Sequence, residues 1–526
     1  MFPKNFKIYS YPFVFSSLLS VFSAVCLVFA YPKFDFSFLA WVALIPFLFA
    51  LDKKTLGQSF WLGYFFGFTF FCGTLYWFIF MSSTEGIPLF LSSLAMVLLV
   101  AYLSVYVGLF GWLTALFRTE SPIKNLFLIP SIWVVLEFLR DGLFSGFGWV
   151  ALGHSQYQQI SIIQIADITG VFGVSFLILM VNLLGKELLQ ALMDKQKDNK
   201  PVLLSCLIVC LFLFTALFYG RQKINEFSSL KKEKINIAVI QANIAQEKKW
   251  DRAFWPQIMD QYIAWTQVAV KENPDMIIWP ETAFPGYLWV QKEQFEELKN
   301  FVDQMNIPLL FGIVTKGKGR YYNSAILISQ EGREEARYNK LHLVPFGEYL
   351  PFRKQFPFLS YIVPIEDFSS GEDVVLFSVA ESKKNLAVLI CFEDTVSWVS
   401  RAMVQKGAHL LVNITNDAWF LDSKAPFLHV QSSVFQAVSH RRALVRAANT
   451  GVSCFIDPLG NIYRCIEDRT GKKTYIAGYA AEKVSFYEKV SFYTKFGDVF
   501  TYFCFGCILL LVILRKINFN NNSLFI

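Results

Sequence analysis

Polar side chains stand directly after several short, β-branched runs in the second half of the chain. Glu281 follows the run DMIIWP, Cys391 follows LAVLI, and Asn416 follows HLLVNI. Lys340 lies between the first two, in the segment YNKLHLVPFGEY. Ligands of α/β sheets bind beyond the carboxyl ends of the strands, so these turns predict one shared site.

A cysteine, a glutamate and a lysine in one site are sufficient for acyl transfer through a thioester. A thiol becomes a strong nucleophile only as the thiolate, so it needs a base or a cation beside it. Glu281 would take the proton of Cys391. Lys340 and a main-chain N–H at the turn after Cys391 would stabilise the oxyanion that forms when a carbonyl is attacked.

Each of these residues also has an ordinary structural explanation. A cysteine that ends a strand often only packs, a glutamate after Trp-Pro can cap a helix, and a lysine is usually solvated. His342, close to Lys340 in the sequence, is an alternative base. Glu348 and Glu393 are either supporting carboxylates or surface charges. Spacing alone leaves these alternatives open.

The elements that must position these residues begin at about residue 221. Short β-branched runs alternate there with amphipathic helical stretches, which is the pattern of a layered α/β domain. We expect this domain to cover 221–496 and to bury a core of its own. The expected strands are 235–241, 275–279, 308–314, 324–329, 386–390, 409–414 and 452–456, and the expected helices are 254–272, 292–304, 395–406 and 427–448.

The composition indicates that lipid is part of the solvent. Hydrophobic residues make up 54% of the chain and charged residues only 17%, against about 25% charged residues in soluble domains. About eight apolar runs approach the roughly 20 residues that a spanning helix needs. They are 11–30, 36–51, 58–80, 87–117, 123–139, 167–185, 202–219 and 497–514. We therefore expect a multi-pass α-helical membrane bundle over 1–220, the extramembrane α/β domain, and a closing membrane helix with a short tail over 497–526.

Lysine and arginine residues give the expected bundle an orientation. With a cytoplasmic N-terminus, most basic loop residues fall on the cytoplasmic side, as the positive-inside rule requires, and Arg515 and Lys516 agree. The α/β domain follows an odd number of spans, so it is expected outside the cytoplasm. The first apolar run is expected to be a retained anchor and not a cleaved signal peptide.

Several other classes of protein are not favoured. The net charge of +7 comes without a dense basic stripe, so nucleic-acid binding is not expected. The nine cysteines show no zinc spacing. Cys454 and Cys465 flank the turn PLGN, where a hairpin would place them face to face. They would form a disulfide in an oxidising compartment, and are otherwise two reduced core thiols. A transporter is disfavoured because Glu137 is the main ionisable candidate within the spans.

Two aromatic segments are expected at the membrane surface. The first is RDGLFSGFGWVALGHSQYQQ at 140–159, which is rich in glycine and contains Trp149. The alternative interpretation of this segment is a plain connector between two helices. YLPFRKQFPFLSYIVP at 349–364 would form an arm that dips into the lipid interface. The alternative for this arm is ordinary packing within the protein.

Three motifs in this order are similar to those of the nitrilase, or carbon–nitrogen hydrolase, superfamily. They are WPETAFP at 279–285, YNKLHLVPFGEYLP at 338–351 and LICFEDT at 389–395, with NDAWF at 416–420 and RRALVRAANTG at 441–451 as further blocks. Three helical segments, PKFDFSFLAWVALIPFL at 32–48, LEFLRDGLFSGFGW at 136–149 and GVFGVSFL at 170–177, resemble the apolipoprotein N-acyltransferase family. The resemblance covers nearly the whole chain. It implies a nitrilase-like αββα sandwich for the α/β domain.

The resemblance also implies roles for individual residues. Glu281 is the implied proton acceptor, Lys340 the oxyanion stabiliser and Cys391 the nucleophile. The implied supporting or substrate-binding residues are Trp149, Trp250, Asn323, Glu348, Phe392 and Glu393. The sequence departs from the family pattern at four places, with Phe392 in place of a common Tyr, Gly148 in place of a Pro, and Gln436 and Ser439 in place of an Arg and a Glu. These departures leave fine contacts with substrate open.

The implied reaction joins two lipid-anchored substrates. A fatty acyl chain passes from a phospholipid, with phosphatidylethanolamine as the implied donor, through a thioester to the α-amine of a diacylated apolipoprotein. The implied place is the periplasmic face of an inner membrane, and the enzyme is expected to be a monomer that needs no metal or other cofactor. The alternative is a membrane-tethered carbon–nitrogen hydrolase acting on a small molecule, which shares the triad and differs in the acyl acceptor. A non-enzymatic scaffold is disfavoured because all three triad residues are present.

Overall fold

The computed structural model describes residues 12–85, 87–193, 199–229, 233–317, 319–357, 367–379 and 383–523. The chain divides into two compact units, which we call the helical unit and the α/β domain. The helical unit comprises Met1–Ile79, Pro88–Lys223 and Asp498–Ile526, and the α/β domain comprises Phe80–Ile87 and Ile224–Gly497. The short segment Phe80–Ile87 thus clusters with the α/β domain, although the sequence analysis placed it in the expected bundle, where it connects the apolar runs 58–80 and 87–117.

The helical unit is built from apolar helices, most of them long. They are α1 (Phe13–Val28), α2 (Ile45–Ala50), α3 (Leu56–Leu75), α5 (Leu89–Phe117), α6 (Pro122–Gly142), α9 (Val171–Met193), α10 (Lys200–Ser229) and α18 (Val499–Ser523). Within the described residues, five helices are long and apolar enough to cross a membrane, namely Leu56–Thr84, Leu89–Phe117, Pro122–Ser145, Val171–Met193 and Lys200–Ser229. The apolar helices Phe13–Val28 and Val499–Ile513 are shorter.

The expected span at 36–51 is not one continuous helix. It consists of a 3₁₀ turn, η1 (Ser37–Trp41), followed by the six-residue helix α2 (Ile45–Ala50), with Pro46 in the first turn of α2. Proline has a fixed φ and lacks an N–H, so it starts a helix readily but does not continue one. This accounts for a new helix beginning in the middle of the apolar run.

Small residues let α3 and α5 approach closely. A Cβ added at Gly63 would lie 2.2 Å from the Val107 carbonyl oxygen, and one at Gly111 would lie 2.2 Å from the Ser59 carbonyl oxygen. Such small-residue contacts are typical of helices that associate in lipid, where apolar burial gives little driving force.

The α/β domain contains two mixed six-stranded sheets. The first has the order β12-β1-β2-β3-β4-β5 and the second has the order β11-β10-β9-β8-β7-β6. In each sheet three central strands run parallel, β1 to β3 and β7 to β9, and the outer strands pair antiparallel. The strands are β1 (Lys234–Gln241), β2 (Met276–Ile278), β3 (Leu309–Gly317), β4 (Arg320–Ile328), β5 (Glu334–Asn339), β6 (Leu376–Ser378), β7 (Asn385–Ile390), β8 (Leu410–Thr415), β9 (Ala443–Ala448), β10 (Cys454–Ile456), β11 (Ile462–Cys465) and β12 (Gly478–Ser485).

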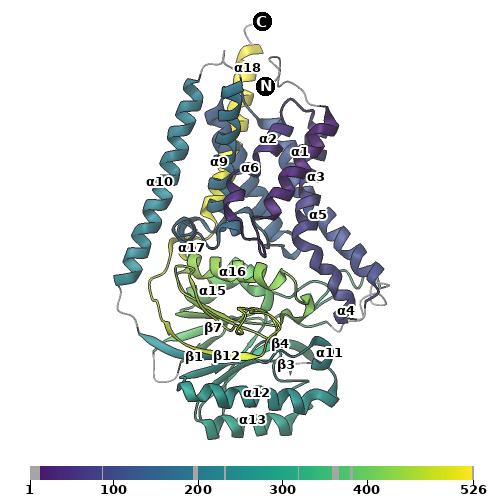
Figure 1. Cartoon of the computed structure of the whole chain (residues 1–526), viewed down its shortest axis with the longest axis vertical. Coiled ribbons are helices and arrows are strands. Elements are labelled where there is room, and N and C mark those ends of the chain that lie inside the picture. Colours follow the sequence, from purple (N-terminus) through teal and green to yellow (C-terminus); the bar gives the residue numbers. More distant parts are fainter. Residues whose placement is uncertain are drawn as a thin grey trace. The chain divides into compact units, whose positions relative to one another are not determined.

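Helices cover the outer faces of the two sheets (Figure 1). Helices α12 (Trp255–Ala269) and α13 (Lys292–Met305) lie on the first sheet, whereas α15 (Ser397–Gln405) and α16 (Ala425–His440) lie on the second. The sheets contact each other through β1 with β9 and β4 with β7. The domain therefore has four layers in the order helix, sheet, sheet, helix.

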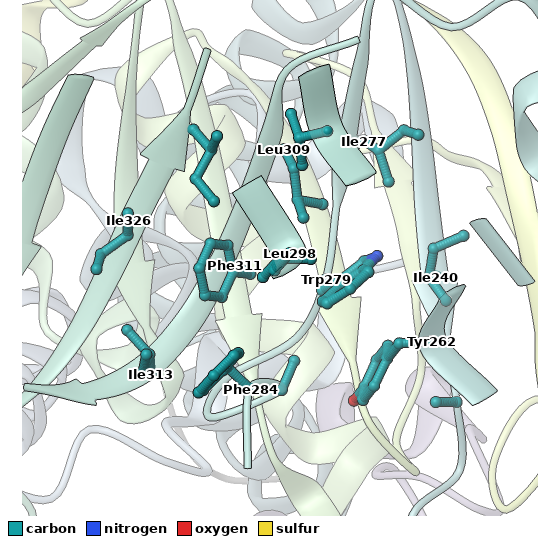
Figure 2. Packing of buried hydrophobic residues seen from close by; sticks show 14 of the residues in the cluster. Ile240, Tyr262, Ile277, Trp279, Phe284, Leu298, Leu309, Phe311, Ile313 and Ile326 are labelled. Atoms are coloured by element: carbon teal, nitrogen blue, oxygen red, sulfur yellow. The ribbon is translucent and has the colours of Figure 1, made fainter. Parts of the chain in front are cut away.

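A hydrophobic core fixes the first sheet against its helices. Figure 2 shows Trp279 at its centre, between Ile277 and Ile240 of the strands and Tyr262 of α12. The Trp279 indole N–H donates to Thr266 Oγ1 at 2.9 Å, so its polar group is satisfied inside the core. Trp279 lies two residues before Glu281, and its burial anchors the turn that carries this glutamate.

The expected strand positions agree with the structure more closely than the expected helix positions. All seven expected runs contain a strand. The expected helix at 427–448 is wrong after His440, because α16 ends there and β9 begins at Ala443. Arg441, with φ 53°, makes this sharp change of direction in the left-handed region, where a non-glycine residue is uncommon.

Cys454 and Cys465 face each other as the hairpin pattern indicated. They are directly opposite in the antiparallel pair of β10 and β11. Both are free thiols in this structure.

Candidate active site

Cys391 occupies a sharp turn at the carboxyl end of β7. It is the first residue of the 3₁₀ helix η7 (Cys391–Thr395) and has φ 52°, a strained conformation that is frequent at active sites. Its main-chain carbonyl oxygen accepts hydrogen bonds from Asn413 Nδ2 at 2.9 Å and from His429 Nε2 at 3.3 Å. These contacts hold the turn that carries the thiol.

The charged groups that act most strongly on the Cys391 thiol are Glu281 and Lys340. Burial raises the pKa of Cys391 well above its usual value, the Glu281 carboxylate raises it further, and the Lys340 ammonium opposes the shift. The thiol therefore keeps its proton at rest, and a base is needed to make the nucleophile. The structure thus brings the three side chains that the sequence singled out into one cluster.

Glu281 follows β2 and is held through both carboxylate oxygens. Oε1 accepts from Asn323 Nδ2 at 2.7 Å, and Oε2 accepts from the Asn416 main-chain N–H at 2.8 Å. Glu281 as a whole is only 7% exposed. Glu281 is therefore aimed into the site, and it does not cap a helix as one alternative proposed.

Lys340 follows β5 and forms a buried ion pair. Its Nζ lies 2.7 Å from Glu348 Oε2, and the lysine side chain is 1% exposed. Burial alone would lower the pKa of Lys340, but attraction to Glu348, and then to Cys391 and Glu281, raises it above the usual lysine range. The group is accordingly a permanent cation at neutral pH.

Asn323 on β4 links the two carboxylates of the site. Its Nδ2 donates to Glu281 Oε1 at 2.7 Å and to Glu348 Oε1 at 2.8 Å. Both hydrogens of one primary amide are thereby used. Asn323 consequently fixes the distance between the glutamate beside Cys391 and the glutamate that holds Lys340.

Glu393 connects the Lys340 turn to the Cys391 turn. One carboxylate oxygen accepts from Tyr338 Oη at 2.8 Å and from the main-chain N–H groups of Leu341 and His342 at 2.7 and 3.1 Å. The other accepts from Ile390 N at 2.7 Å. Burial raises the pKa of Glu393 to about 7, against the opposing effects of Lys340 and the hydrogen bonds. Glu393 is thus a supporting carboxylate and not a surface charge.

The remaining expected site residues occupy different places. Trp250 is 41% exposed and lies 6.3 Å from the Tyr287 ring. The Phe392 ring stacks on His342 at 6.1 Å. Trp149 belongs to the helical unit, where it is buried against Trp77. Of the expected surface arm at 349–364, residues 358–364 lie outside the described residues.

A buried charge network beneath the Cys391 turn was not predicted as a unit. Arg446 on β9 donates to Asp394 at 2.8 Å and to Asp417 at 3.1 Å. His429 on α16 contacts the same two carboxylates, at 2.7 Å and 3.0 Å. Burial and Arg446 lower the pKa of His429, but attraction to Asp394 and Asp417 outweighs them and raises it. The network holds the turn from below, because His429 also reaches the Cys391 carbonyl.

Lys249 was also missed by sequence reasoning. It is the last residue of α11 (Gln246–Lys249), is 3% exposed, and donates from Nζ to the Glu281 main-chain oxygen at 2.9 Å. The motif QEKKW contains it, but nothing local distinguishes this lysine from its neighbour Lys248.

Known proteins match most of the chain. The family model described as "Apolipoprotein N-acyltransferase N-terminal domain" matches residues 23–184, and the one described as "Carbon-nitrogen hydrolase" matches 236–487. The apolipoprotein N-acyltransferase of Geobacter metallireducens is 36% identical over 494 residues, which cover 93% of this chain and 92% of that protein. The apolipoprotein N-acyltransferase of Pasteurella multocida is 28% identical over 95% of both chains.

Among solved structures, an amidase of the nitrilase superfamily from Nesterenkonia matches 49% of this chain and 92% of its own, with a TM-score of 0.36 and 17% identity. The relative from Geobacter extends over both units of the structure, as the two family models do together. This chain belongs to the apolipoprotein N-acyltransferase family.

Proposed function

We propose that this chain transfers a fatty acyl group from a phospholipid to the α-amine of the diacylglyceryl-cysteine of apolipoproteins, through a thioester on Cys391. The observation that carries the proposal is the cluster in which Glu281 and Lys340 are the charged groups acting most strongly on the Cys391 thiol. Family membership supports the reaction, since the curated relatives are N-acyltransferases of apolipoproteins. The reaction is the last step of lipoprotein maturation.

In the first half-reaction Cys391 takes the acyl chain. The Glu281 carboxylate accepts the thiol proton, and the sulfur attacks the carbonyl carbon of the phospholipid ester. Lys340 and a main-chain N–H beside Cys391 stabilise the oxyanion. When the carbon–oxygen bond to the glycerol breaks, the leaving oxygen takes the proton from Glu281. A lysophospholipid departs and a thioester remains.

In the second half-reaction the amine of the apolipoprotein attacks the thioester carbonyl. Glu281 accepts a proton from the amine, and the same groups stabilise the second oxyanion. The carbon–sulfur bond then breaks, the amide is released, and the proton on Glu281 returns to the sulfur. The ester and thioester supply the driving force, so the proposed cycle uses no metal or other cofactor.

The membrane arrangement extends the proposal. We place about eight spans in 1–220 and 497–526, with both termini in the cytoplasm and the domain at 221–496 on the periplasmic side of an inner membrane. The five long apolar helices and the loop lysines support this arrangement. Confining both lipid substrates to one surface raises their effective concentration. We further propose a monomer that takes phosphatidylethanolamine as donor.

The exposed start of the 349–364 segment is consistent with a lipid-facing arm. Phe352 and Phe356 are 58% and 50% exposed. Replacing the aromatic residues of this arm by serine is expected to reduce acylation of membrane-bound substrate. Unchanged acylation would contradict the proposal that this segment contacts the lipid.

Mass spectrometry of the purified full-length protein tests the reaction. Incubation with phosphatidylethanolamine is expected to add one fatty acyl mass to the tryptic peptide that contains Cys391. A synthetic diacylated lipopeptide is then expected to discharge this adduct and gain the same mass on its α-amine. Release of ammonia from small amides, with no lipid adduct, would instead support the carbon–nitrogen hydrolase alternative.

Lys340→Met is expected to slow thioester formation by about 10²- to 10³-fold, because one preorganised cation that stabilises the oxyanion is lost. The rate is measured in a single turnover with excess phospholipid. Lys271→Met serves as control, since Lys271 is an exposed lysine of the same domain. Equal slowing of both variants would contradict the assignment of Lys340.

Gly312→Ala is expected to reduce acyl transfer by about 10²-fold, because a small displacement of a catalytic group has effects of this size. A Cβ added at Gly312 would lie 2.4 Å from Thr282 N and 2.6 Å from Glu281 Cα, so the Glu281 turn must move. Gly317→Ala, on the same strand, is the matched control, since its Cβ would meet only Tyr322 at 3.8 Å. Wild-type turnover in Gly312→Ala would show that the position of this turn is not critical.

A further inference from the structure

Lys249 is a second buried cation at the site, and the proposed reaction does not yet use it. Its ammonium is anchored on the main-chain oxygen of Glu281 at 2.9 Å. The groups that act on its charge are Glu281 and Cys391. Within the described part of the chain, no carboxylate lies within ion-pair distance of Lys249.

Burying this lysine costs stability. Burial lowers the pKa of Lys249 to about 8, although attraction to Glu281 and Cys391 opposes the shift. Between pH 8 and the usual lysine pKa of 10.5 the unfolded chain therefore binds more protons than the folded chain. The penalty is fully present below pH 8 and is relieved as the pH rises through this window. By contrast, the other buried lysine of the site, Lys340, is paired with Glu348.

The charges around the reacting sulfur balance only when Lys249 is counted. Lys340 and Glu348 form an ion pair and cancel. Glu281 carries one further negative charge, which it shares with Cys391 when the thiol proton moves between them. Lys249 supplies the matching positive charge. It contacts the main-chain oxygen of Glu281, whereas the carboxylate contacts Asn323 and Asn416.

Two neighbouring carboxylates are matched by groups of their own. Asp417, which also acts on Cys391, is bonded to Arg446 and His429. Glu393, which also acts on Lys340, accepts four hydrogen bonds at the adjoining turns. Neither carboxylate therefore needs Lys249 as a counter-charge.

We propose that Lys249 is a positioning residue of the acyl-transfer reaction. It fixes the Glu281 turn through the main-chain carbonyl and places a second positive charge against the Cys391–Glu281 pair. The inference rests on the proposed function in so far as it takes Cys391 and Glu281 as the reacting pair. A positive charge at this place favours the thiolate and the oxyanions that follow it.

The test compares two lysines that are neighbours on α11. Lys249→Met removes the buried charge, and Lys248→Met removes an exposed charge whose Nζ lies 5.3 Å from the Phe254 ring. The full-length proteins are alkylated with iodoacetamide over a range of pH, and mass spectrometry follows the Cys391 peptide. Lys249→Met is expected to raise the apparent pKa of the Cys391 thiol by about one unit, which slows alkylation about tenfold at pH 7. Lys248→Met is expected to match the wild type.

Two further measurements separate positioning from a merely structural role. The melting temperatures of Lys249→Met and Lys249→Arg at pH 7 identify any loss of stability, and the alkylation profiles are compared at a temperature at which both variants are folded. Lys249→Arg, which keeps the charge, is expected to retain an alkylation profile closer to the wild type than Lys249→Met. An alkylation profile of Lys249→Met identical to that of Lys248→Met, with both variants folded, would overturn the inference.

Alkylation needs no lipid, so the two proposals can fail separately. A shifted thiol pKa without any acyl adduct would leave Lys249 as a positioning residue and reject the phospholipid donor. An acyl adduct that forms at the wild-type rate in Lys249→Met would reject Lys249 and keep the acyl transfer.

Discussion

Cys391→Ala is expected to abolish acyl transfer, with a loss of about 10⁴-fold or more, because the thioester cannot form. Glu281 and Lys340 remain in this variant, but they serve a nucleophile that is no longer there. Neither an acyl adduct on the protein nor an N-acylated lipopeptide should be detected. The substitution changes little besides the thiol, because alanine keeps the Cβ of Cys391 and must adopt the same φ of 52°.

Cys391→Ser refines this expectation. The hydroxyl has a much higher pKa than the thiol, so the serine variant is expected to form an oxyester slowly and to turn over poorly. Cys465→Ser is a suitable control, because Cys465 is a partly exposed free thiol on the edge strand β11. N-acylated product formed by Cys391→Ala at one hundredth of the wild-type rate would show that a different group carries the acyl chain.

Arg446→Met is expected to lower the free energy of unfolding by about 3–5 kcal/mol, the usual result of removing one partner from a buried ion pair. The Arg446 guanidinium is fully buried and contacts both Asp394 and Asp417. Without it two carboxylates share one imidazolium, that of His429. The Cys391 turn, whose carbonyl His429 contacts, should loosen at the same time.

Thermal unfolding of the full-length protein in detergent measures this loss, with Arg464→Met as control for an exposed arginine on β11. Adding Asp417→Asn to Arg446→Met should restore part of the stability, because one unpaired charge is removed. In the wild type burial would raise the pKa of Asp417, but Arg446 and His429 lower it to about 2. Its contribution to stability is therefore present above the ordinary pKa of 3.8 and is lost as the pH falls toward 2. Equal stability of wild type and Arg446→Met would rule out a structural role for the network.

The sequence was most informative where local pattern decides structure. The amphipathic helix α13 buries Phe295, Leu298 and Val302, at the spacing of a single helical face, and its expected range of 292–304 ends one residue short. The strands before Glu281 and Cys391 are short, apolar and almost entirely buried, which is typical of central parallel strands. Their carboxyl ends carry the polar residues, so both the sheet and the location of the site could be predicted.

The parts that were missed depend on long-range contacts. The segment Ala443–Ala448 is buried at every position, so no alternation marks it as a strand, and its alanines suit a helix equally well. Arg446 pairs with Asp394, 52 residues away in the sequence. Lys249 donates to the main-chain oxygen of Glu281, which lies 32 residues further along the sequence. Such pairings arise only when strands that are distant in the sequence come together within one sheet, and no local spacing encodes them.

The double donation by Asn323 has a practical consequence for genetic dissection of the site. One amide group serves the base of the reaction and the counter-ion of the lysine together, through its bonds to Glu281 and Glu348. Any replacement of Asn323 perturbs both partners at once, so its phenotype cannot be divided between them. Epistasis between Glu281 and Glu348 is therefore built into the scaffold, and double-mutant cycles across these two glutamates should be strongly non-additive even though their side chains share no direct bond.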